Sequence, residues 1–344
     1  MKIWIVLAIA LLMVTGVIGA AGWFVLAVPP PSIVNPQTVA IASGESFKKV
    51  AQKLANARVV WNPWAFILFG ELSGQARMVK PGDYSFKGGE TMAGVLGHLV
   101  RGDTIVVTVT IPEGITVNQV AGRLAASGLV CEGEFERAAR HGPLVEAIGL
   151  GATGSEGYLF PATYRFSPRA TIDEILGAML RRFYATLTPQ VEERLFDLNL
   201  TAREMVTLAS IIEKEAKAPG ERPLIASVFY NRLRLGMPLQ SDPTAQYNPD
   251  DPGIEETPAL AAVHTPSAFN TYEFVGLPPG PIANPGGPSM MAALYPAHSD
   301  YLYFVARDDG THIFSRTFAE HERAIESIKR EAGRGGASVA GRAE

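Results

Sequence analysis

The chain begins with a long apolar stretch. Residues 3–28 include no charged side chain, Lys2 is the only charge before them, and the next charge along the chain is Glu45. About 20 apolar residues cross a bilayer as a helix, whereas the apolar part of a cleavable signal peptide is about 7–15 residues long. We therefore predict a single-pass transmembrane anchor over 1–28, with cleavage after the small residues 19–22 as the alternative. Lysine tends to remain cytoplasmic, so Lys2 predicts a cytoplasmic N-terminus.

After a proline-rich linker over 29–35, one pattern of polar and apolar positions recurs. A serine or threonine follows a glycine-containing turn, and apolar residues then follow at helical spacing, near residues 46, 91 and 116 and more weakly near 171. The hydroxyl oxygen of such a residue accepts a hydrogen bond from an unpaired amide of the first helical turn. The pattern predicts capped helices at these four places, with strands over 38–41 and 104–111. The region 36–110 is thus expected to form a small α+β unit.

The first two of these repeats resemble the LysM fold, a carbohydrate-binding βααβ module. The resemblance is carried by Gly44-Glu45-Ser46 and Gly89-Glu90-Thr91, each followed by the helical pattern. It implies a LysM-like subdomain over 36–110. Ordinary capped helices without a sugar site are the alternative interpretation.

From residue 111 the pattern changes to longer helical segments. Helices are predicted over 116–127, 132–140, 171–186, 188–197, 201–217 and 221–235. A region rich in proline and glycine follows to about 296, and strands over 301–306 and 311–315 precede a helix over 317–331. We predict a mixed α+β catalytic domain over 111–331 and a disordered tail over 332–344. The whole chain is therefore expected to be of the α+β class.

The proline-rich region carries aromatic and amide side chains rather than charges, so we predict that it is a long ordered loop. Aromatic ring faces and amides are the groups that a sugar groove uses. A rigid scaffold loop is the alternative.

Composition excludes several classes of function. The formal net charge is -4 and the basic residues form no cluster, which argues against a nucleic-acid partner. Cys131 is the single cysteine, so neither an internal disulfide nor a cysteine-based zinc site is possible. The six histidines form no His-Glu-x-x-His motif, and no Gly-x-Ser-x-Gly elbow occurs. We predict no metal and no cofactor.

The helix predicted over 201–217 carries the strongest candidate chemistry. At about 100° per residue, Lys214 points away from the apolar face of this helix, and Glu213 and Glu215 lie at its two opposite edges. A carboxyl at such an edge loses solvation, which raises its pKa towards the range of a general acid. Periodicity alone does not choose between the two glutamates, and a solvated helix end is the alternative.

The same region resembles the YceG-like family of endolytic murein transglycosylases. The matching segments run through 156–161, 211–216, 221–222, 226–233, 237–244, 270–272, 276–282, 284–286 and 301–305, with His312. The chain departs from the family pattern at Ala162, where an acidic residue is usual, and at Ala268-Phe269, where Pro-Tyr is usual. These departures concern local loop geometry rather than the helix with the two glutamates.

The resemblance implies a catalytic residue and a reaction. Glu215 corresponds to the catalytic glutamate of the family, which cuts the β-1,4 bond between N-acetylmuramic acid and N-acetylglucosamine and leaves 1,6-anhydro ends. One carboxyl acts first as acid and then as base. Expected substrate-binding or supporting residues are Gln240, Asp242, Thr244, Asn270 and Tyr272. Candidates for a second carboxylate are Glu213, Glu156 and Asp242, and the sequence does not choose among them.

The resemblance also implies partners and a location. The expected substrate is the peptidoglycan glycan strand, most readily the nascent one, and association with peptidoglycan synthases is expected. Together with the predicted anchor, it implies an inner-membrane protein with a periplasmic catalytic domain. The alternative function is a membrane-tethered, non-catalytic protein that binds peptidoglycan or acts as a division scaffold.

Overall fold

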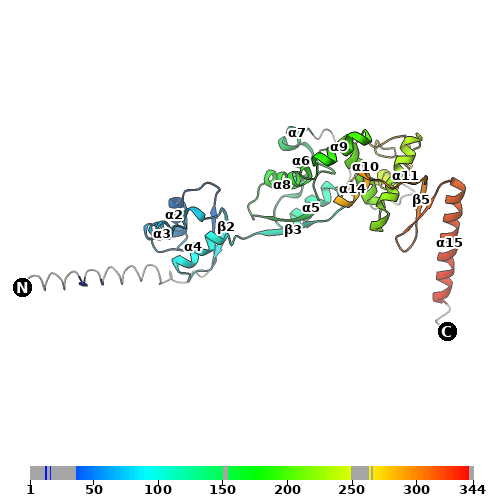
Figure 1. The fold of residues 1–344 in the computed structure, drawn as a ribbon. Coiled ribbons are helices and arrows are strands. Elements are labelled where there is room, and N and C mark those ends of the chain that lie inside the picture. Colours follow the sequence, from blue (N-terminus) through cyan, green and yellow to red (C-terminus); the bar gives the residue numbers. More distant parts are fainter. Residues whose placement is uncertain are drawn as a thin grey trace, which may run out of the picture. The chain divides into compact units, whose positions relative to one another are not determined.

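The computed structural model describes residues 36–149, 154–248, 263, 264 and 266–340, together with Leu12, Met13 and Gly16. Among these residues no helix combines the length and apolarity needed to cross a bilayer. Nearly all of the predicted anchor over 1–28 lies outside the described residues. The chain has a mixed α+β fold, as predicted, and divides into two compact units (Figure 1). Unit 1 extends to Val107 and includes Arg165–Arg169, and unit 2 comprises Thr108–Tyr164 and the chain from Ala170.

Unit 1 pairs two short strands and adds three helices. Its elements are β1 (Gln37–Ile41), α2 (Phe47–Asn56), α3 (Pro63–Leu72), the 3-10 helix η1 (Ala76–Met78), β2 (Gly82–Phe86) and α4 (Met92–Arg101). Strand β1 is antiparallel to β2, with Gln37 opposite Phe86 and Ile41 opposite Gly82. The sequence interpretation missed β2, because glycine, aspartate and serine are depleted in strands. The strand predicted over 104–111 is β3 (Val107–Ile111), and it pairs with β4 (Ala162–Phe166) rather than with β1.

The hydrophobic core of unit 1 is complete within residues 39–99. Helices α2 and α3 approach closely in it, since Phe47 stacks on Phe66 with ring centroids 5.4 Å apart. A Cβ at Gly70 would lie 2.4 Å from the Phe47 ring, so only glycine permits this approach. Ser46 and Thr91 cap α2 and α4 through their side chains, as the recurring pattern predicts.

Unit 2 is mainly helical. Its helices are α5 (Val117–Ala126), α6 (Glu132–His141), α7 (Pro143–Ala147), α8 (Ile172–Tyr184), α9 (Pro189–Leu198), α10 (Ala202–Glu215), the 3-10 helix η3 (Pro219–Glu221), α11 (Arg222–Arg234), α12 (Asp242–Gln246), α14 (Gly287–Leu294) and α15 (Phe318–Ala340). Strands β5 (Tyr303–Ala306) and β6 (His312–Ser315) form an antiparallel pair. The six helices predicted between 116 and 235 are confirmed.

Two regions of unit 2 differ from expectation. The predicted loop after residue 236 contains the short helices α12 and α14, while 249–262 and 265 lie outside the described residues. Helix α15 continues to Ala340, into the segment for which the composition predicts disorder.

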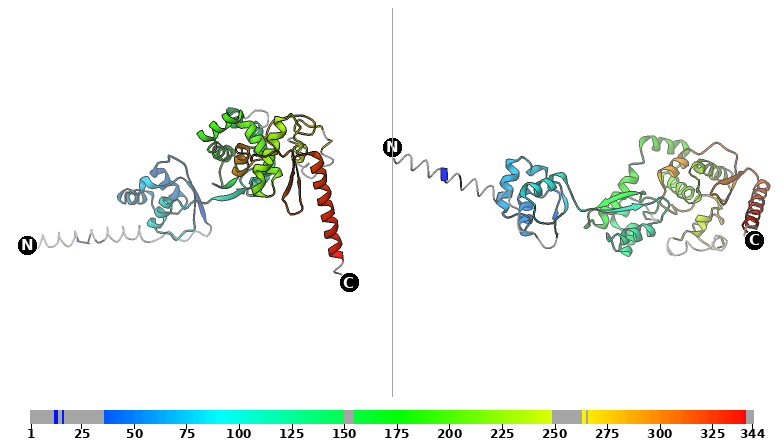
Figure 2. Two further views of the ribbon diagram at one scale, coloured as in Figure 1. Left: turned by 45° about the vertical axis from the view of Figure 1, so that its right-hand side comes forward. Right: turned by 90° about the horizontal axis from the view of Figure 1, so that it is seen from below.

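Helix α10 lies at the centre of unit 2. Thr201 and Glu204 form a capping box at its start, and every residue from 205 to 212 is buried. It packs against α9, α11, α12 and α14, and both views of Figure 2 show α14, in orange, among the green helices of this unit. The centre of the unit thus holds the end of α10 in place, where the candidate glutamates lie.

Candidate active site

Glu215 is the last residue of α10. Ala216 leaves the helical conformation, with φ -79° and ψ 105°, so the chain turns away directly after the carboxyl. The side chain of Glu215 is partly buried, and its Oε1 accepts a hydrogen bond of 2.6 Å from the Ser241 hydroxyl. The C-terminal end of a helix carries a partial negative charge, which disfavours ionisation of a carboxyl there.

The surroundings of Glu215 favour its neutral form. Burial raises the pKa of Glu215 to about 7, and the nearby negative charge of Asp242 also raises it. The Ser241 hydrogen bond and the charge of Lys217 lower the pKa of Glu215, but burial outweighs them. A carboxyl with this pKa can both give and take a proton near neutral pH.

The hydroxyl groups of Thr244 and Thr271 hold the backbone of Ser241 beside Glu215. The Ser241 amide donates to Thr271 Oγ1 at 3.1 Å, and the Thr244 hydroxyl donates to the Ser241 carbonyl at 2.6 Å. A hydroxyl has one proton, so Thr271 donates in the 2.7 Å contact between the two threonine oxygens. The Ser241 hydroxyl therefore remains the donor to Glu215. Oε2 makes no bond with Ser241, so we assign the proton of the neutral acid to this oxygen.

Arg232 fixes the segment that leads into Ser241. Its guanidinium is buried and donates to the carbonyls of Pro238 and Leu239 at 3.1 and 2.9 Å and to Gln240 Oε1 at 3.1 Å. Gln240 has a φ of +51°, which costs a non-glycine residue about 1 kcal/mol. This strained turn is held by Arg232 and by a 3.1 Å hydrogen bond from the Gln240 backbone amide to the Thr271 carbonyl.

The rim of the site carries polar groups. Asp242 and Gln240 are exposed, and the Tyr272 hydroxyl donates to Asp242 Oδ1 at 2.6 Å. Burial raises the pKa of Tyr272, and the Asp242 hydrogen bond raises it further, so this hydroxyl stays protonated at neutral pH. Asp242 thus presents a negative charge beside Glu215 while Tyr272 fixes its orientation.

The other two predicted substrate residues lie inside the protein. Thr244 and Asn270 are fully buried. Asn270 Nδ2 donates to the Val263 carbonyl at 2.9 Å, and its Oδ1 accepts from the Tyr272 amide at 3.1 Å. Through these bonds the two side chains support the segments that carry Ser241 and Tyr272.

Glu213 lies on the other edge of α10 and has charged and amide partners. It forms a buried ion pair with Arg222 at 3.1 Å and accepts from the Gly286 amide at 3.0 Å. Glu113 lies beside it, since a Cβ at Gly286 would meet the Glu113 carboxyl. Partial burial, and then the charge of Glu213, raise the pKa of Glu113. The two glutamates of α10 thus differ in their partners: Glu213 is paired with a guanidinium, and Glu215 accepts a hydrogen bond from a hydroxyl.

Glu156 is a second buried carboxyl with a raised pKa. Its oxygens accept from the Val117 amide at the start of α5, at 3.1 and 3.2 Å, and from Asn284 and Tyr247 at 3.3 Å each. Burial raises the pKa of Glu156 to about 7 against the lowering effect of these bonds and of Arg140. Its hydrogen bonds join α5 to the segment around Asn284.

Sequence reasoning missed Ser241 and Arg232 as parts of this site. Ser241 lies inside a segment that the family resemblance covers, but no sequence pattern indicates that its hydroxyl bonds to Glu215, 26 residues earlier in the chain. Arg232 lies on α11, where a buried arginine is unexpected because arginine is rarely fully buried. Only the folded arrangement shows the acceptors that Arg232 binds.

A mixed α+β fold with a partly buried, hydroxyl-bonded glutamate at a polar rim has the groups that an acid–base enzyme site uses. Comparison with known proteins then gives the family. The YceG-like family matches residues 39–327, and the chain belongs to this family.

Similar proteins support this assignment over most of the chain. The endolytic murein transglycosylase of Bacillus subtilis (strain 168) is 31% identical over 317 residues, which cover 83% of each chain. The endolytic murein transglycosylase of Streptococcus pneumoniae serotype 2 (strain D39) is 30% identical over 84% of this chain, which spans 57% of that protein. A crystal structure of a yceG-like protein from Listeria monocytogenes superposes with a TM-score of 0.58 at 30% identity, covering 84% of this chain and 99% of the other.

Proposed function

We propose that the chain is a peptidoglycan lytic transglycosylase in which Glu215 is both the acid and the base. The observation that carries the proposal is the state of Glu215: partly buried, hydrogen bonded to Ser241 at 2.6 Å, and with its pKa raised to about 7. The names of the relatives from Bacillus and Streptococcus support the choice of murein as substrate. Cleavage is endolytic by the same comparison.

The first step transfers a proton from Glu215 Oε2 to the oxygen of the β-1,4 bond between N-acetylmuramic acid and N-acetylglucosamine. The bond between that oxygen and C1 breaks, and N-acetylglucosamine leaves as an alcohol. Positive charge develops at C1, and the substrate's own N-acetyl group assists there. Asp242, fixed by Tyr272, adds a negative charge at the rim of the site.

The second step returns the proton. The Glu215 carboxylate takes a proton from the C6 hydroxyl of the same muramic acid, and the C6 oxygen bonds to C1 to close the 1,6-anhydro ring. No water is consumed, and the glutamate ends in its starting state. The Ser241 hydroxyl stabilises the intermediate carboxylate, because it donates to Oε1.

One carboxyl is sufficient for this reaction. Glycosidases that use water position two carboxyls, about 5–5.5 Å or about 6.5–9.5 Å apart. Here Glu213 is paired with Arg222, and Glu156 accepts bonds from the start of α5. We therefore assign supporting roles to both, and assign sugar contacts to Gln240, Asp242 and Tyr272.

Product chemistry tests the proposal. Purified protein is incubated with isolated sacculi, and the released fragments are identified by mass spectrometry. We expect anhydro-ended fragments from the wild-type protein and none from Glu215→Gln. The matched control is Glu193→Gln, which alters an exposed residue of α9 and should release the same fragments as the wild type. Reducing ends would indicate a hydrolase, and no release would indicate the non-catalytic wall-binding alternative. Either result would overturn the proposal.

We further infer that the chain is a single-pass inner-membrane protein with a cytoplasmic N-terminus and a periplasmic catalytic domain. The uncharged run over 3–28 and the position of Lys2 support this. A C-terminal alkaline phosphatase fusion should be active, and the mature protein should keep residues 1–28 by mass. Loss of these residues would indicate a cleaved signal peptide instead.

We also infer that β1 to β2 of unit 1 form a LysM-like module that binds glycan. The order β1-α2-α3-β2 supports this, as does a cavity of about 830 Å³ lined by residues of 41–50 and 71–81. Glu71 and Arg77 contribute polar groups to the cavity. Substitution of both by glutamine should weaken the binding of chitin oligomers in calorimetry, whereas Lys87→Gln, outside the cavity lining, should not. Equal binding by all three proteins would refute a glycan site in this cavity.

A further inference from the structure

Helix α3 of unit 1 is apolar around most of its circumference. Its sequence, PWAFILFGEL, contains one charged residue, Glu71. A helix of this composition is normally covered on all sides. Phe66 and Gly70 face the core of unit 1, but Trp64, Leu68 and Leu72 are 67%, 59% and 80% exposed. A large part of the apolar surface of α3 therefore has no cover from the described part of the chain.

The exposed side chains form one continuous surface. Trp64, Leu68 and Leu72 are spaced by four residues and therefore lie along one side of the helix. Trp61, 48% exposed, precedes the N-cap residue of α3. We call Trp61, Trp64, Leu68 and Leu72 the α3 face. Glu71 lies at the edge of this face and also lines the cavity of unit 1, so the apolar surface ends where the polar cavity begins.

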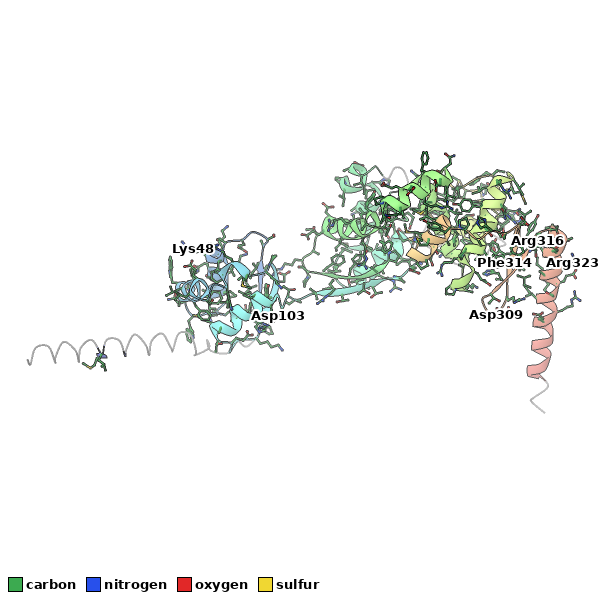
Figure 3. All side chains as sticks on the ribbon, in the orientation of Figure 1. Lys48, Asp103, Asp309, Phe314, Arg316 and Arg323 are labelled. Atoms are coloured by element: carbon green, nitrogen blue, oxygen red, sulfur yellow. The ribbon has the colours of Figure 1, made fainter. Side chains whose placement is uncertain are left out.

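We propose that the α3 face docks on the lipid surface of the membrane that holds the N-terminal anchor. The proposal rests on the anchor inferred above and is independent of the catalytic assignment to Glu215. Tryptophan is enriched where a protein meets the bilayer interface, because its ring is amphipathic. The Lys48 ammonium lies 5.3 Å from the centre of the Trp64 ring. Lys48, labelled in Figure 3, can from there reach lipid phosphates while the ring enters the interface.

The linker keeps unit 1 at the membrane. Residues 29–35 separate the predicted anchor from the first described residue of unit 1 and can span at most about 25 Å. A compact unit of this size is about 30 Å across. The linker therefore keeps the first residue of unit 1 within about 25 Å of the end of the anchor, close enough for a surface of unit 1 to reach the lipid head groups.

The charge of unit 1 suits an anionic bilayer. Residues 36–107 and 165–169 contain ten lysine and arginine residues against five aspartate and glutamate residues. The whole chain has the opposite balance, with 30 basic and 34 acidic residues. Basic segments next to a membrane are attracted to anionic lipids. The unit that carries the uncovered apolar face is therefore also the basic one.

Tryptophan fluorescence can test the proposal on the full chain. The four tryptophans are Trp4, Trp23, Trp61 and Trp64. In the Trp4→Phe/Trp23→Phe protein, all tryptophan emission comes from the α3 face. This protein is reconstituted in vesicles of phosphatidylcholine and phosphatidylglycerol, with and without brominated acyl chains. We expect blue-shifted emission that falls at least about twofold with the brominated lipid.

A second measurement removes the anchor. The chain from residue 36 onwards retains the core of unit 1, which draws only on residues 39–99. It should bind phosphatidylglycerol vesicles in flotation, and Leu68→Gln/Leu72→Gln should weaken this binding about tenfold or more. The matched control is Phe196→Gln/Leu235→Gln, which alters side chains that are 86% and 57% exposed on unit 2. It should bind as the parent does.

The outcomes separate the lipid surface from other occupants. Emission unaffected by brominated lipid and quenched by aqueous iodide would overturn the proposal. Protection from iodide in the chain from residue 36 onwards, in buffer without vesicles or detergent, would also overturn it, because a second copy would then cover the face. Neither measurement depends on glycan cleavage, so a negative result here would not contradict the catalytic assignment to Glu215.

Discussion

Replacement of Glu215 by glutamine should abolish turnover and, at alkaline pH, stabilise the fold. Glutamine keeps the size of the side chain and an oxygen that can accept the Ser241 hydrogen bond. It cannot donate a proton to the glycosidic oxygen, so cleavage is lost at every pH. It also never carries the negative charge that burial disfavours at this position.

The expected stabilisation follows from proton linkage. Between about pH 4.5 and 7 the folded protein keeps a proton on Glu215 that the unfolded chain has released, so the free energy of unfolding falls as the pH rises through this window. A pKa raised from 4.5 to about 7 corresponds to about 3 kcal/mol, and partial exposure reduces this to about 2–3 kcal/mol. The variant should therefore match the wild type near pH 4 and exceed its stability by about 2–3 kcal/mol at pH 8.

Chemical unfolding of both proteins across this pH range measures the difference. Glu156 titrates in the same range but is present in both proteins, so its effect cancels. Glu193→Gln should change neither activity nor the pH dependence of stability. A stability difference that is the same at all pH values would show that Glu215 titrates normally in the folded state and would refute the desolvation argument. Residual turnover would refute the catalytic role.

Three further substitutions test the surroundings of the site. Ser241→Ala should lower turnover about tenfold or more. It should also move the alkaline limb of the kcat/KM profile to higher pH, because a hydrogen bond that lowers the pKa of Glu215 is lost. An alkaline limb at lower pH would contradict this reasoning. Glu156→Ala should lower the free energy of unfolding by about 1–3 kcal/mol in urea titrations, because the Val117 amide and the Asn284 side chain lose their acceptor. Glu156→Gln keeps an acceptor oxygen and should restore most of this stability. Arg222→Leu should lower the free energy of unfolding by about 3–5 kcal/mol, because it leaves the buried Glu213 carboxylate without its cation. A loss of stability that Glu213→Gln in the same protein does not reduce would exclude an uncompensated charge as the cause.

Local signals in the sequence predicted the helices, including the one that carries the two candidate glutamates. Thr201 begins α10 and Thr171 begins α8, each with a glutamate three residues later that completes a capping box. These signals work because a cap satisfies amides within one turn of the same segment. The strand β2 carried a weaker signal, because the depleted residues Gly82 and Asp83 stand beside the strand-forming Tyr84, and its pairing with β1 is decided only in the folded unit.

The sequence by itself determined that two glutamates lie at opposite edges of one helix, since a helical period is enough to place them. Only the tertiary structure decided between their roles. Arg222 comes from the next helix and neutralises Glu213, whereas Ser241 comes from a distant turn and leaves Glu215 without a cation in hydrogen-bond contact among the described residues. A pKa depends on burial and on charges brought together through space, and the chain order of residues contains neither. Glu215, the proposed catalytic carboxyl, is therefore distinguished from its neighbour Glu213 by the partners that folding brings to each.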